Sequence, residues 1–459
     1  MATKVTIIGG GSSSFVPLLV RRLMQSPVLG SSQVTLMDVD EGRLSVMQSL
    51  ADKLIANENS ELRVTSTTDQ RESLAGADFV IAAISVGGMD AWANDLEIPG
   101  RHGIVMHVGD SVGPGGIMRA FRNAPVLADV ARNAAEVAPD AWVFNYTNPA
   151  PIEALAMRAA APQVRSYALC SCTGHPSSRE WLAHQAGVEP DRIAMPPVVA
   201  GINHCASIQQ LRLTDGTDAM PLVHERATEP IVRWVLDRYG VLPYCWSHWT
   251  EFFPQMQRLE ADYAGTAQGV SMRYGITTHD MAYERARVRG LEQLAETWTA
   301  EDAAPVTLAD LPKGDEDEGI EVIDLIEAIV DNGNITLVVN APNEGTIPNL
   351  PDEAIVEVNA QINAYGIRPI QAGPLPDALA AHLNHYFNFQ QHVVKAALSG
   401  DRRAALHAFL LDPTLQANLD LDQTQALLDE MLEANRRWLP LFEDQAAAAS
   451  ANAANTTAR

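Results

Sequence analysis

Short apolar runs alternate with longer amphipathic stretches along the first third of the chain. Each run is rich in valine, isoleucine, leucine or phenylalanine, which is typical of strands buried on both faces. The stretches between the runs, notably Ile117–Val137, repeat alanine, leucine and valine at helical spacing. Strands that alternate with helices favour a parallel, doubly wound sheet. The strand candidates are Val5–Ile8, Val34–Met37, Leu62–Thr65, Phe79–Ala82, Trp142–Asn145 and Arg165–Leu169.

A different pattern begins near residue 176. Apolar runs mix with helical stretches there, which predicts an α+β domain over residues 176–445 behind a doubly wound domain over residues 1–175. Residues 302–318 are rich in proline and acidic side chains and predict an exposed loop. Residues 378–443 predict the last helices, and residues 446–459 form a low-complexity tail. The apolar runs are Val198–Ile202, Gln209–Leu213 and Ile335–Asn340.

Composition narrows the classes of partner. The chain has 459 residues, with 32 Lys plus Arg and 57 Asp plus Glu, which gives a net charge of −25. Such acidity argues against nucleic acid or an anionic membrane as a partner. No apolar run reaches the roughly 18 residues of a membrane span, and the N-terminus enters a strand without a signal peptide, so we expect a cytoplasmic protein. The 4 cysteines are too few for a disulfide framework in a chain of this length.

A glycine turn follows the first strand. Its spacing, Gly9-x-Gly11-x-x-Ser14, is that of a turn that brings backbone N–H groups and a helix N-terminus to a pyrophosphate. Asp38 ends the second strand, where an acid binds the ribose hydroxyls of NAD and repels the 2′-phosphate of NADP. Alternatively, the turn binds no nucleotide and Asp38 is only a turn acid or a helix cap. The candidate NAD-binding residues are Gly9, Gly10, Gly11, Ser12, Ser13, Phe15 and Asp38.

Two polar loops should face the same crevice, because ligands of such sheets lie at the carboxyl ends of the strands. The Gly/Pro-rich loop 109–116 leads into a helix with Arg119 and Arg122, which can bind anionic or sugar oxygens. The loop 145–149 offers asparagine donors and acceptors for hydroxyl groups. The alternatives are a rigid turn with two solvated arginines in the first loop, and Asx turns with a helix cap in the second.

Cysteine and histidine stand at two further strand ends. Cys170 and Cys172 follow the sixth strand, with His175 behind them, and His204 lies in the segment 201–205. One cysteine and one histidine with positions left open for substrate suit a catalytic divalent metal. A structural Cys-x-Cys pair and a hydrogen-bonded core histidine are the alternatives.

Taken together, these segments resemble those of glycoside hydrolase family 4, from Val5 to about Pro440. The motifs are short, but their order and spacing are specific. The resemblance implies a Rossmann domain joined to an α+β domain of the lactate/malate dehydrogenase type, assembled as a homodimer or homotetramer. It also implies a small carbohydrate substrate, NAD and a divalent metal, usually Mn²⁺. The matching segments are Ile8–Ser12, Gly87-Gly88, Glu97–Pro99, Gly103, Gly109-Asp110, Gly113–Gly116, Asn145–Pro149, Cys170, Asn203-His204, Asn340–Pro351 and Val356-Glu357.

The resemblance also implies roles for single residues. Cys170 and His204 would be the metal ligands, and Asp110 an acid near the metal and the substrate hydroxyls. In the family's reaction, NAD takes hydride from C3 of the sugar, a base removes the acidified C2 proton, the C1 group leaves, water adds, and the hydride returns. The net reaction is hydrolysis with NAD unchanged, outside the usual two-carboxylate scheme. The candidate substrate-binding residues are Trp92, Arg119, Asn148, Asn203 and Glu357.

Departures from the family pattern affect the proton transfers. Ser171 follows the metal cysteine where branches of the family have Asp, Asn or His. Because a serine hydroxyl is a poor acid at neutral pH, the nearby Cys172 and His175 are the candidate substitutes. The family base is a tyrosine, but Thr250 or Phe252 falls at its position in this chain. The candidate catalytic residues are therefore Asp110, Tyr244, His248 and Cys172.

Trp92 bears on the substrate. It stands where branches that act on 6-phosphorylated sugars carry arginine, and an aromatic ring stacks on a sugar where arginine would pair with phosphate. Alternatively, Trp92 only packs. The sequence thus predicts an NAD- and metal-dependent glycosidase for an unphosphorylated, α-linked hexoside or uronide. A 6-phospho-glycosidase of the same family, a simple dehydrogenase and a non-catalytic NAD-binding protein are the alternatives.

Overall fold

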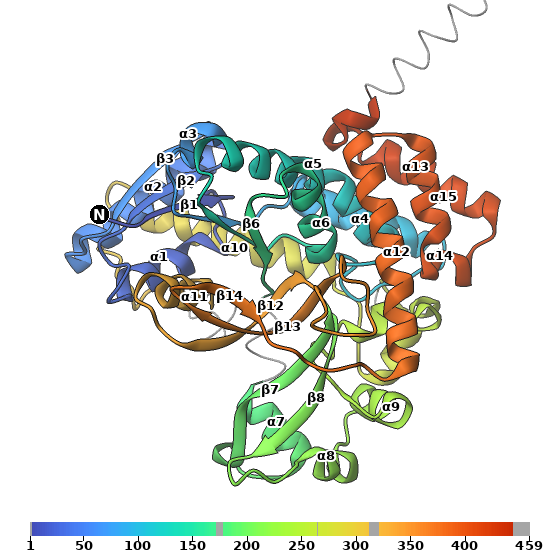
Figure 1. The fold of residues 1–459 in the computed structure, drawn as a ribbon. Helices are drawn as coiled ribbons and strands as arrows, with labels where there is room; N and C mark the ends of the chain where they lie inside the picture. The colour runs from blue at the N-terminus through green and yellow to red at the C-terminus, as the bar shows by residue number, and fades with distance from the viewer. Residues whose placement is uncertain (1, 171–177, 264, 312–320, 444–459) are drawn as a thin grey trace, which may run out of the picture.

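The first part of the chain forms a parallel sheet. The computed structural model (Figure 1) describes residues 2–170, 178–263, 265–311 and 321–443. Its six parallel strands have the order β3-β2-β1-β4-β5-β6, the arrangement of a dinucleotide-binding fold. The predicted fold class is therefore confirmed, and the predicted strands lie within two residues of the observed ones. The strands are β1 (Lys4–Ile8), β2 (Gln33–Met37), β3 (Arg63–Thr67), β4 (Phe79–Ala82), β5 (Trp142–Asn145) and β6 (Arg165–Ala168).

Helices connect these strands, and short polar side chains begin several of them. Asp40 accepts a 3.0 Å hydrogen bond from the backbone N–H of Arg43, which caps the first turn of the helix that follows β2. The long helix predicted at 117–137 begins earlier, at Gly113, because proline is favoured in a first helical turn. The helices are α1 (Val16–Gln25), α2 (Glu41–Glu58), α3 (Gln70–Leu74), α4 (Gly88–Arg101), α5 (Gly113–Val137) and α6 (Ala150–Ala160).

The sheet continues into the second half of the chain with antiparallel strands. A single pair, Asn340 with Ala168, joins β12 to β6, and β13, β7, β8 and β9 follow in that order. In Figure 1 the green β7–β8 hairpin reaches up to β12 and β13 at the centre of the molecule. These strands are β7 (Ile193–Ile202), β8 (Cys205–Leu213), β9 (Leu242–Pro243), β12 (Ile335–Pro342), β13 (Ile355–Asn363) and β14 (Gly366–Pro369), which pairs with β13.

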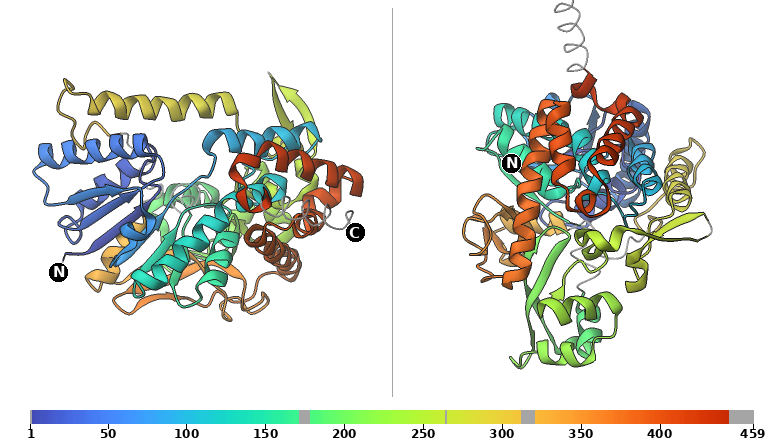
Figure 2. Two further views of the ribbon diagram at one scale, coloured as in Figure 1. Left: turned by 90° about the horizontal axis from the view of Figure 1, so that it is seen from above. Right: turned by 90° about the vertical axis from the view of Figure 1, so that its right-hand side faces the viewer.

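Helices of the second half pack back onto the first. Helix α10 lies along α2, and α12 packs against α5 and α6 (Figure 2). Strands β10 (Leu259–Tyr263) and β11 (Thr266–Gly269) form a separate hairpin. The helices are α7 (Arg179–Ala186), α8 (Met220–Arg226), α9 (Pro230–Tyr239), α10 (Met281–Thr299), α11 (Glu321–Val330), α12 (Asp377–Ser399), α13 (Arg402–Leu411), α14 (Pro413–Asn418) and α15 (Leu421–Ala434), with 3₁₀ turns η2 (Pro190–Arg192), η3 (Trp249–Phe252), η4 (Pro254–Gln257), η5 (Val270–Tyr274) and η6 (Arg436–Trp438).

Some predictions concern exposure and the chain end. Residues 302–311 form no helix or strand, in line with the predicted loop, and the rest of that loop lies outside the described residues. The predicted tail 446–459 also lies outside them. Among the described helices, none is both long and apolar enough to cross a membrane.

One row of paired residues crosses the sheet from β3 to β8, and we call it the register row. Each member pairs with the next on the neighbouring strand. Candidate site residues follow the row within three positions, for example Gly9 after Ile8 and Cys170 after Ala168. The register row consists of Thr67, Met37, Ile8, Ala82, Asn145, Ala168, Asn340, Glu357, Gly201 and Ala206.

Candidate active site

The glycine turn after β1 is fixed by backbone contacts. The N–H groups of Gly9 and Gly10 donate to the carbonyl oxygen of Met37 at 2.9 and 2.8 Å. Gly9 has a φ of +96°, and a Cβ atom there would lie 2.2 Å from the carbonyl oxygen of Ala83. Only glycine fits such a position, because it needs both a positive φ and the space of a missing side chain. The turn therefore lies tightly between β2 and β4.

The remaining predicted cofactor residues surround this turn. Asp38 accepts hydrogen bonds from Gly11 N–H at 2.9 Å and from Asp40 N–H at 3.0 Å, so it orders its own loop, while Asp40 is the cap of α2. Ser12 Oγ accepts from the N–H of Phe15 at 3.2 Å. The Phe15 ring lies edge-on to Tyr146 at 5.1 Å. Ser13 and Gly11 line a small cavity between α2 and α10.

A cleft of about 890 Å³ extends from the carboxyl ends of β2 and β4. Its walls come from the first half of the chain and from α10 and η6. The predicted substrate-binding residues Trp92 and Arg119 both line it. Trp92 donates its indole N–H to the carbonyl oxygen of Val108 at 2.8 Å, which fixes the ring beside the loop that carries Asp110. Lining residues include Asp38, Ser85, Gly87, Trp92, Arg119 and Trp438.

Arg122 has a different role from its neighbour Arg119. Its guanidinium forms two hydrogen bonds with the Asp95 carboxylate, at 2.9 and 2.5 Å, and both residues are buried. The same guanidinium donates to the carbonyl oxygen of Val86 and to Asn435. Arg122 thus ties α5 to α4 and to the C-terminal helices, and it is neither a solvated arginine nor a lining residue of the cleft.

The two predicted metal ligands lie side by side. Cys170 Sγ is 3.2 Å from His204 Nε2, and both side chains are buried. Cys170 comes two residues after the end of β6, and His204 occupies the two-residue turn between β7 and β8 with a φ of +67°. Residues 34 positions apart in the sequence therefore meet through the pairing of β6, β12, β13 and β7.

Asp110 lies next to this pair in a hydrogen-bonded group. Its Oδ1 accepts from the Ser111 hydroxyl at 2.8 Å, and its Oδ2 accepts from the Asn148 side-chain amide at 2.8 Å. Burial would raise the pKa of Asp110, but positive charge on His204 and His248 holds that pKa at about 2. Asp110 is therefore an ionised acceptor, and sequence reasoning did not assign a role to Ser111.

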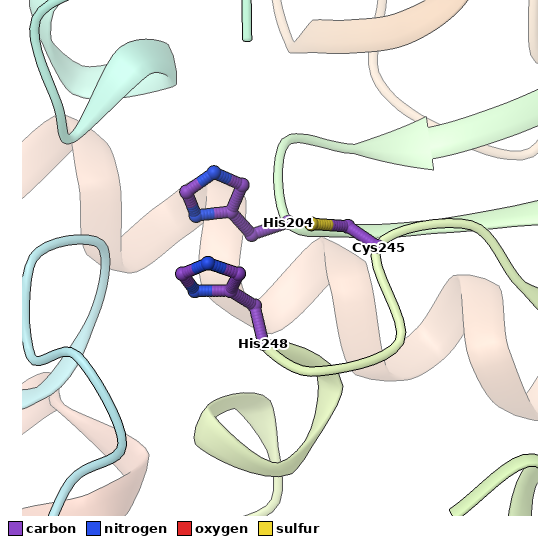
Figure 3. Close-up of side chains that lie close together, drawn as sticks. All are labelled: His204, Cys245 and His248. Atoms are coloured by element: carbon purple, nitrogen blue, oxygen red, sulfur yellow. The ribbon is translucent and has the colours of Figure 1, made fainter. Parts of the chain in front are cut away.

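His248 stacks on His204. The ring centroids are 3.9 Å apart and the planes differ by 23°, and Figure 3 shows one imidazole over the other with the Cys245 thiol pointing toward them. His248 Nδ1 is 3.1 Å from Glu251 Oε2. Burial would raise the pKa of Glu251, but this hydrogen bond and the charge on His248 lower that pKa below its usual value. Donor atoms of His204, Cys245 and His248 lie within 4.8 Å of one another.

Glu251 was missed by sequence reasoning, although it stands three residues after His248. Its Oε1 accepts from the backbone N–H groups of Val108 and Gly109 at 3.0 and 2.7 Å. One buried carboxylate therefore connects the imidazole of His248 to the loop that carries Asp110. The signal in the sequence was a His-x-x-Glu spacing, which places both side chains on one side of a 3₁₀ turn.

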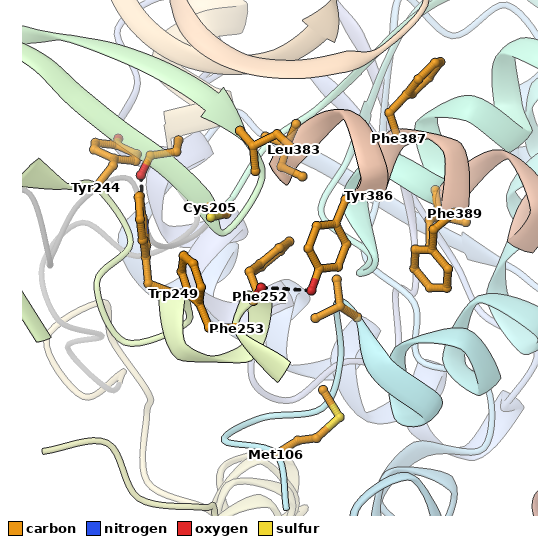
Figure 4. Packing of buried hydrophobic residues seen from close by; sticks show 14 of the residues in the cluster. Met106, Cys205, Tyr244, Trp249, Phe252, Phe253, Leu383, Tyr386, Phe387 and Phe389 are labelled. Atoms are coloured by element: carbon orange, nitrogen blue, oxygen red, sulfur yellow. Dashed lines mark hydrogen bonds between the residues drawn. The ribbon is translucent and has the colours of Figure 1, made fainter. Parts of the chain in front are cut away.

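An aromatic core supports the segment that carries His248 (Figure 4). Trp249 donates its indole N–H to the carbonyl oxygen of Ala206 at 2.8 Å, and Tyr386 donates its hydroxyl to that of Phe252 at 3.0 Å. Trp249, Phe252 and Tyr386 are fully buried. These contacts hold η3 against β8 and α12, so His248 cannot move without disturbing the core.

The predicted residues Asn203 and Glu357 form a second polar group beside the cysteine. Glu357 Oε1 accepts from the amides of Asn203 at 2.9 Å and Asn340 at 3.3 Å. Burial raises the pKa of Glu357 to about 7, and negative charge on Cys170 acts in the same direction. Asn203 Oδ1 and Glu357 Oε2 are buried and have no hydrogen-bond partner among the described residues.

Tyr244 and Cys172 are the remaining two residues that the sequence predicts for proton transfer. Tyr244 is buried, and burial raises the pKa of its hydroxyl well above the usual value. Its backbone N–H donates to Ala206 at 2.9 Å. Cys172, with Ser171 and His175, lies outside the described residues.

Comparison with known proteins follows the same segments. A model described as family 4 glycosyl hydrolase matches residues 4–182, and one for the C-terminal domain of that family matches residues 199–415. The α-galactosidase of Bacillus subtilis (strain 168) is 30% identical over 456 residues, which span 96% of this chain and 100% of that protein.

Two solved structures share the fold. The crystal structure of lplD from Bacillus subtilis has a TM-score of 0.80 at 26% identity and covers 94% of this chain and 100% of that one. A 6-phospho-α-glucosidase from gut microorganisms, solved in complex with NAD and Mn²⁺, has a TM-score of 0.77 at 22% identity and covers 95% of this chain and 99% of that one. The two family matches together span most of the sequence, and the chain belongs to glycosyl hydrolase family 4.

Proposed function

We propose that this protein is an NAD- and divalent-metal-dependent glycosidase for an unphosphorylated, α-linked hexoside or uronide. The observation that carries the proposal is the Cys170–His204 pair, 3.2 Å apart and beside the ionised Asp110, at the same edge of the sheet as the glycine turn. The α-galactosidase relative supports an α-linked substrate, and the NAD and Mn²⁺ in the 6-phospho-α-glucosidase structure support the cofactor and the metal.

The residues present fit a divalent metal. Thiolate, imidazole and carboxylate are the donor types that first-row divalent metals bind, and substrate oxygens can complete the shell. The buried Glu357 Oε2 and Asn203 Oδ1, without partners among the described residues, show that polar capacity is left over next to the pair. We assign Cys170 and His204 as the ligands, with Glu357 and Asn203 as binding groups for substrate hydroxyls or water.

The residues also fit the cofactor. Gly9 and Gly10 bring backbone close to the cleft, and Asp38 lies on its wall. NAD, when bound, supplies a reversible hydride acceptor for C3 of the sugar, and the metal supplies a Lewis acid for its oxygens. The protein must then orient the sugar, remove the C2 proton and protonate the leaving oxygen at C1.

Orientation falls to the polar groups around Asp110. Asn148 donates one amide proton to Asp110 and keeps its carbonyl and second N–H for substrate hydroxyls. Arg119 lines the cleft, and its Nε is buried without a hydrogen-bond partner among the described residues. These groups suit a polyhydroxylated ligand, because each can bind an oxygen without breaking a bond that the fold needs.

His248 is our choice for the base. The ionised Glu251 accepts the proton on His248 Nδ1, and in that tautomer the neutral ring carries its lone pair on Nε2, as a base requires. Tyr244 is a weaker candidate, because burial raises its pKa and the phenolate would be scarce near neutral pH. Asp110 is too strong an acid to serve as proton donor. Cys172 therefore stays the predicted donor.

Trp92 supports an unphosphorylated substrate. Its ring takes the position that the resemblance gives to a phosphate-binding arginine, and it lines the cleft. Two arginines of the cleft, Arg285 and Arg437, are already bound to Asp90 at 2.6 and 3.2 Å. The Asp90 carboxylate therefore offsets one of these two positive charges within the protein.

A panel of nitrophenyl glycosides, with and without a 6-phosphate, tests the proposal. With NAD and Mn²⁺ present we expect hydrolysis of an unphosphorylated α-hexoside or α-uronide, loss of activity on chelation, and solvent deuterium at C2 of the released sugar. Hydrolysis of 6-phosphoglycosides alone would overturn the substrate class. Product without deuterium would overturn the elimination route, and NADH that accumulates with turnover would indicate a simple dehydrogenase.

The assembly completes the proposal. We expect a homodimer or homotetramer, on the resemblance to family 4. Sedimentation of the purified protein tests the assembly, and a monomer with full activity would contradict it.

A further inference from the structure

Asp110, Ser111 and His204 are connected by two short contacts. The contacts end at His204 Nδ1, the ring nitrogen that does not face Cys170. Asp110 Oδ1 is 2.8 Å from Ser111 Oγ, and Ser111 Oγ is 2.6 Å from His204 Nδ1. All three residues are buried. The two short contacts share one hydroxyl group, which carries a single proton.

The charge of Asp110 decides where that proton goes. An aspartate side chain is ordinarily ionised at neutral pH, and each oxygen of Asp110 faces a donor, the Ser111 hydroxyl or the Asn148 amide, so its carboxylate can only accept. The second oxygen, Oδ2, is already used as an acceptor for Asn148. The Ser111 hydroxyl must therefore donate to Asp110, and its oxygen is left to accept from His204.

We propose that Ser111 is a positioning residue that fixes His204 as the Nδ1–H tautomer, so that the lone pair of Nε2 is directed at the metal site beside Cys170. The inference rests on the metal assignment of the proposed function and adds to it the group that prepares the ligand. A ligating imidazole needs its other nitrogen held by an acceptor, and the loss of such a partner weakens metal binding about 10- to 100-fold.

The position of Ser111 is built into the backbone. It lies in the loop before α5, and a Cβ atom on Gly116 would come within 2.7 Å of the Ser111 carbonyl carbon. The first turn of α5 therefore packs directly on the serine backbone. Glu251 holds the other side of the loop through Gly109 N–H at 2.7 Å. The hydroxyl is thus held on both sides by groups other than its own hydrogen bonds.

The directions of these hydrogen bonds predict a distinct effect of Asp110→Asn on the tautomer of His204. The carboxamide oxygen would face the Asn148 amide, and its N–H would face Ser111 and donate to it. Ser111 would then donate to His204 Nδ1, and the imidazole proton would move to Nε2, where it blocks the metal. Replacement of the carboxylate by its near-isostere should therefore weaken metal binding more than removal of the serine hydroxyl.

Titration of the full-length protein with Mn²⁺, with the free ion followed by electron paramagnetic resonance, tests the inference. We expect Ser111→Ala to weaken Mn²⁺ binding about 10- to 100-fold, Ser111→Thr to bind as the parent does, and Asp110→Asn to bind most weakly. The unfolding temperature of each variant checks that the fold is intact.

Several outcomes would overturn the proposal. Ser111→Ala that binds Mn²⁺ like the parent, or folded Ser111→Thr that binds as weakly as Ser111→Ala, would remove the hydroxyl from the argument. If Asp110→Asn binds Mn²⁺ more tightly than Ser111→Ala does, the hydrogen-bond directions assigned here are wrong. In metal-free protein with ¹⁵N-labelled histidine, the His204 signal should show the proton on Nδ1 in the parent and on Nε2 in Asp110→Asn, and the same tautomer in both would refute it.

The failure of this inference is separable from failure of the proposed function. If Cys170→Ala and His204→Ala lose Mn²⁺ while Ser111→Ala keeps it, the metal site stands and the positioning role falls. If Cys170→Ala and His204→Ala also keep it, the metal assignment itself is wrong.

Discussion

The glycine turn and the proposed metal centre are fixed by different kinds of contact. The turn consists of consecutive residues, and backbone contacts such as Gly9 N–H to Met37 fix it. The metal centre draws on Asp110, Cys170, His204 and Glu251, which are far apart in the chain and meet through side chains. Steric exclusion by the backbone defines the first region, and a hydrogen-bonded network with definite proton positions defines the second. The two should therefore fail in different ways.

The largest effect is expected at the metal pair. Cys170→Ala and His204→Ala should each lower kcat by about 1,000-fold or more, because the Lewis acid contributes several kcal/mol to the transition state. The affinity for NADH, measured by fluorescence titration, should stay unchanged, since the turn does not depend on these side chains. A parallel loss of NADH binding would break the comparison, and unchanged kcat would remove the metal assignment.

The base is expected to matter next. His248→Gln should lower kcat by about 100-fold or more, the range for loss of a general base, while Mn²⁺ binding persists. Tyr244→Phe is the matched control, because the ring that packs in the site remains. We expect it to keep most of its activity in steady-state assays. If Tyr244→Phe is the more damaged variant, the base has been assigned to the wrong residue.

The turn should fail by sterics. Gly9→Ala meets the Ala83 carbonyl at 2.2 Å and imposes a φ of +96° on alanine, so we expect about 3 kcal/mol less stability and loss of NAD binding. Gly88→Ala is the control: its φ is +53°, and no atom lies within 4 Å of the added Cβ. It should lose only about 1 kcal/mol. Urea unfolding measures both, and equal losses would show that the close approach is not the cause.

The smallest effect concerns acid sensitivity near the metal centre. Burial lowers the pKa of His107 from its ordinary 6.5 to about 4, and the positive charge of His248 adds to this. Below pH 6.5 the unfolded chain takes up a proton that the folded protein refuses until near pH 4, so stability should fall by about 2 kcal/mol between pH 7 and pH 5 and further toward pH 4.

His107→Gln isolates that contribution. The variant should lose less stability than the parent between pH 7 and pH 5, in urea unfolding at both values. Glu251, His248 and His279 also face His107 and are present in both proteins, so only the difference between parent and variant is informative. A steeper fall in the variant would show that the folded protein protonates His107 readily.

What the sequence predicts well is local. A run such as Phe79–Ala82 must form a buried strand, and the glycines at 9–11 exclude side chains, so the strands and the turn follow from neighbouring residues alone. Cys170 and His204 could be named because their segments resemble a known family. Their 3.2 Å separation depends on antiparallel pairing across β12 and β13, which no local pattern encodes.

What the sequence does not predict acts through other segments. Glu251 reads as an ordinary acid until its oxygens are seen to bind both His248 and the backbone before Asp110. Arg122 reads like Arg119, but three residues fall about 60° short of a full helical turn, and Arg122 binds Asp95 while Arg119 lines the cleft. Ser111 is one small residue in a glycine-rich loop, and its proton has a direction only once both neighbours are placed.

The register row has a consequence for engineering. Site residues such as Gly9, Cys170 and His204 follow the row within three positions. The pairing of the row therefore fixes where each of these residues lies relative to the others. A deletion of one residue inside β6 or β13 would turn the next side chain to the opposite face and misplace one donor while the others stay. Loops beyond the first three positions can change length without that penalty. A designer who wished to transplant this centre would therefore copy the row, its immediate followers, and the two segments outside the row that complete the site, residues 109–111 and 248–251.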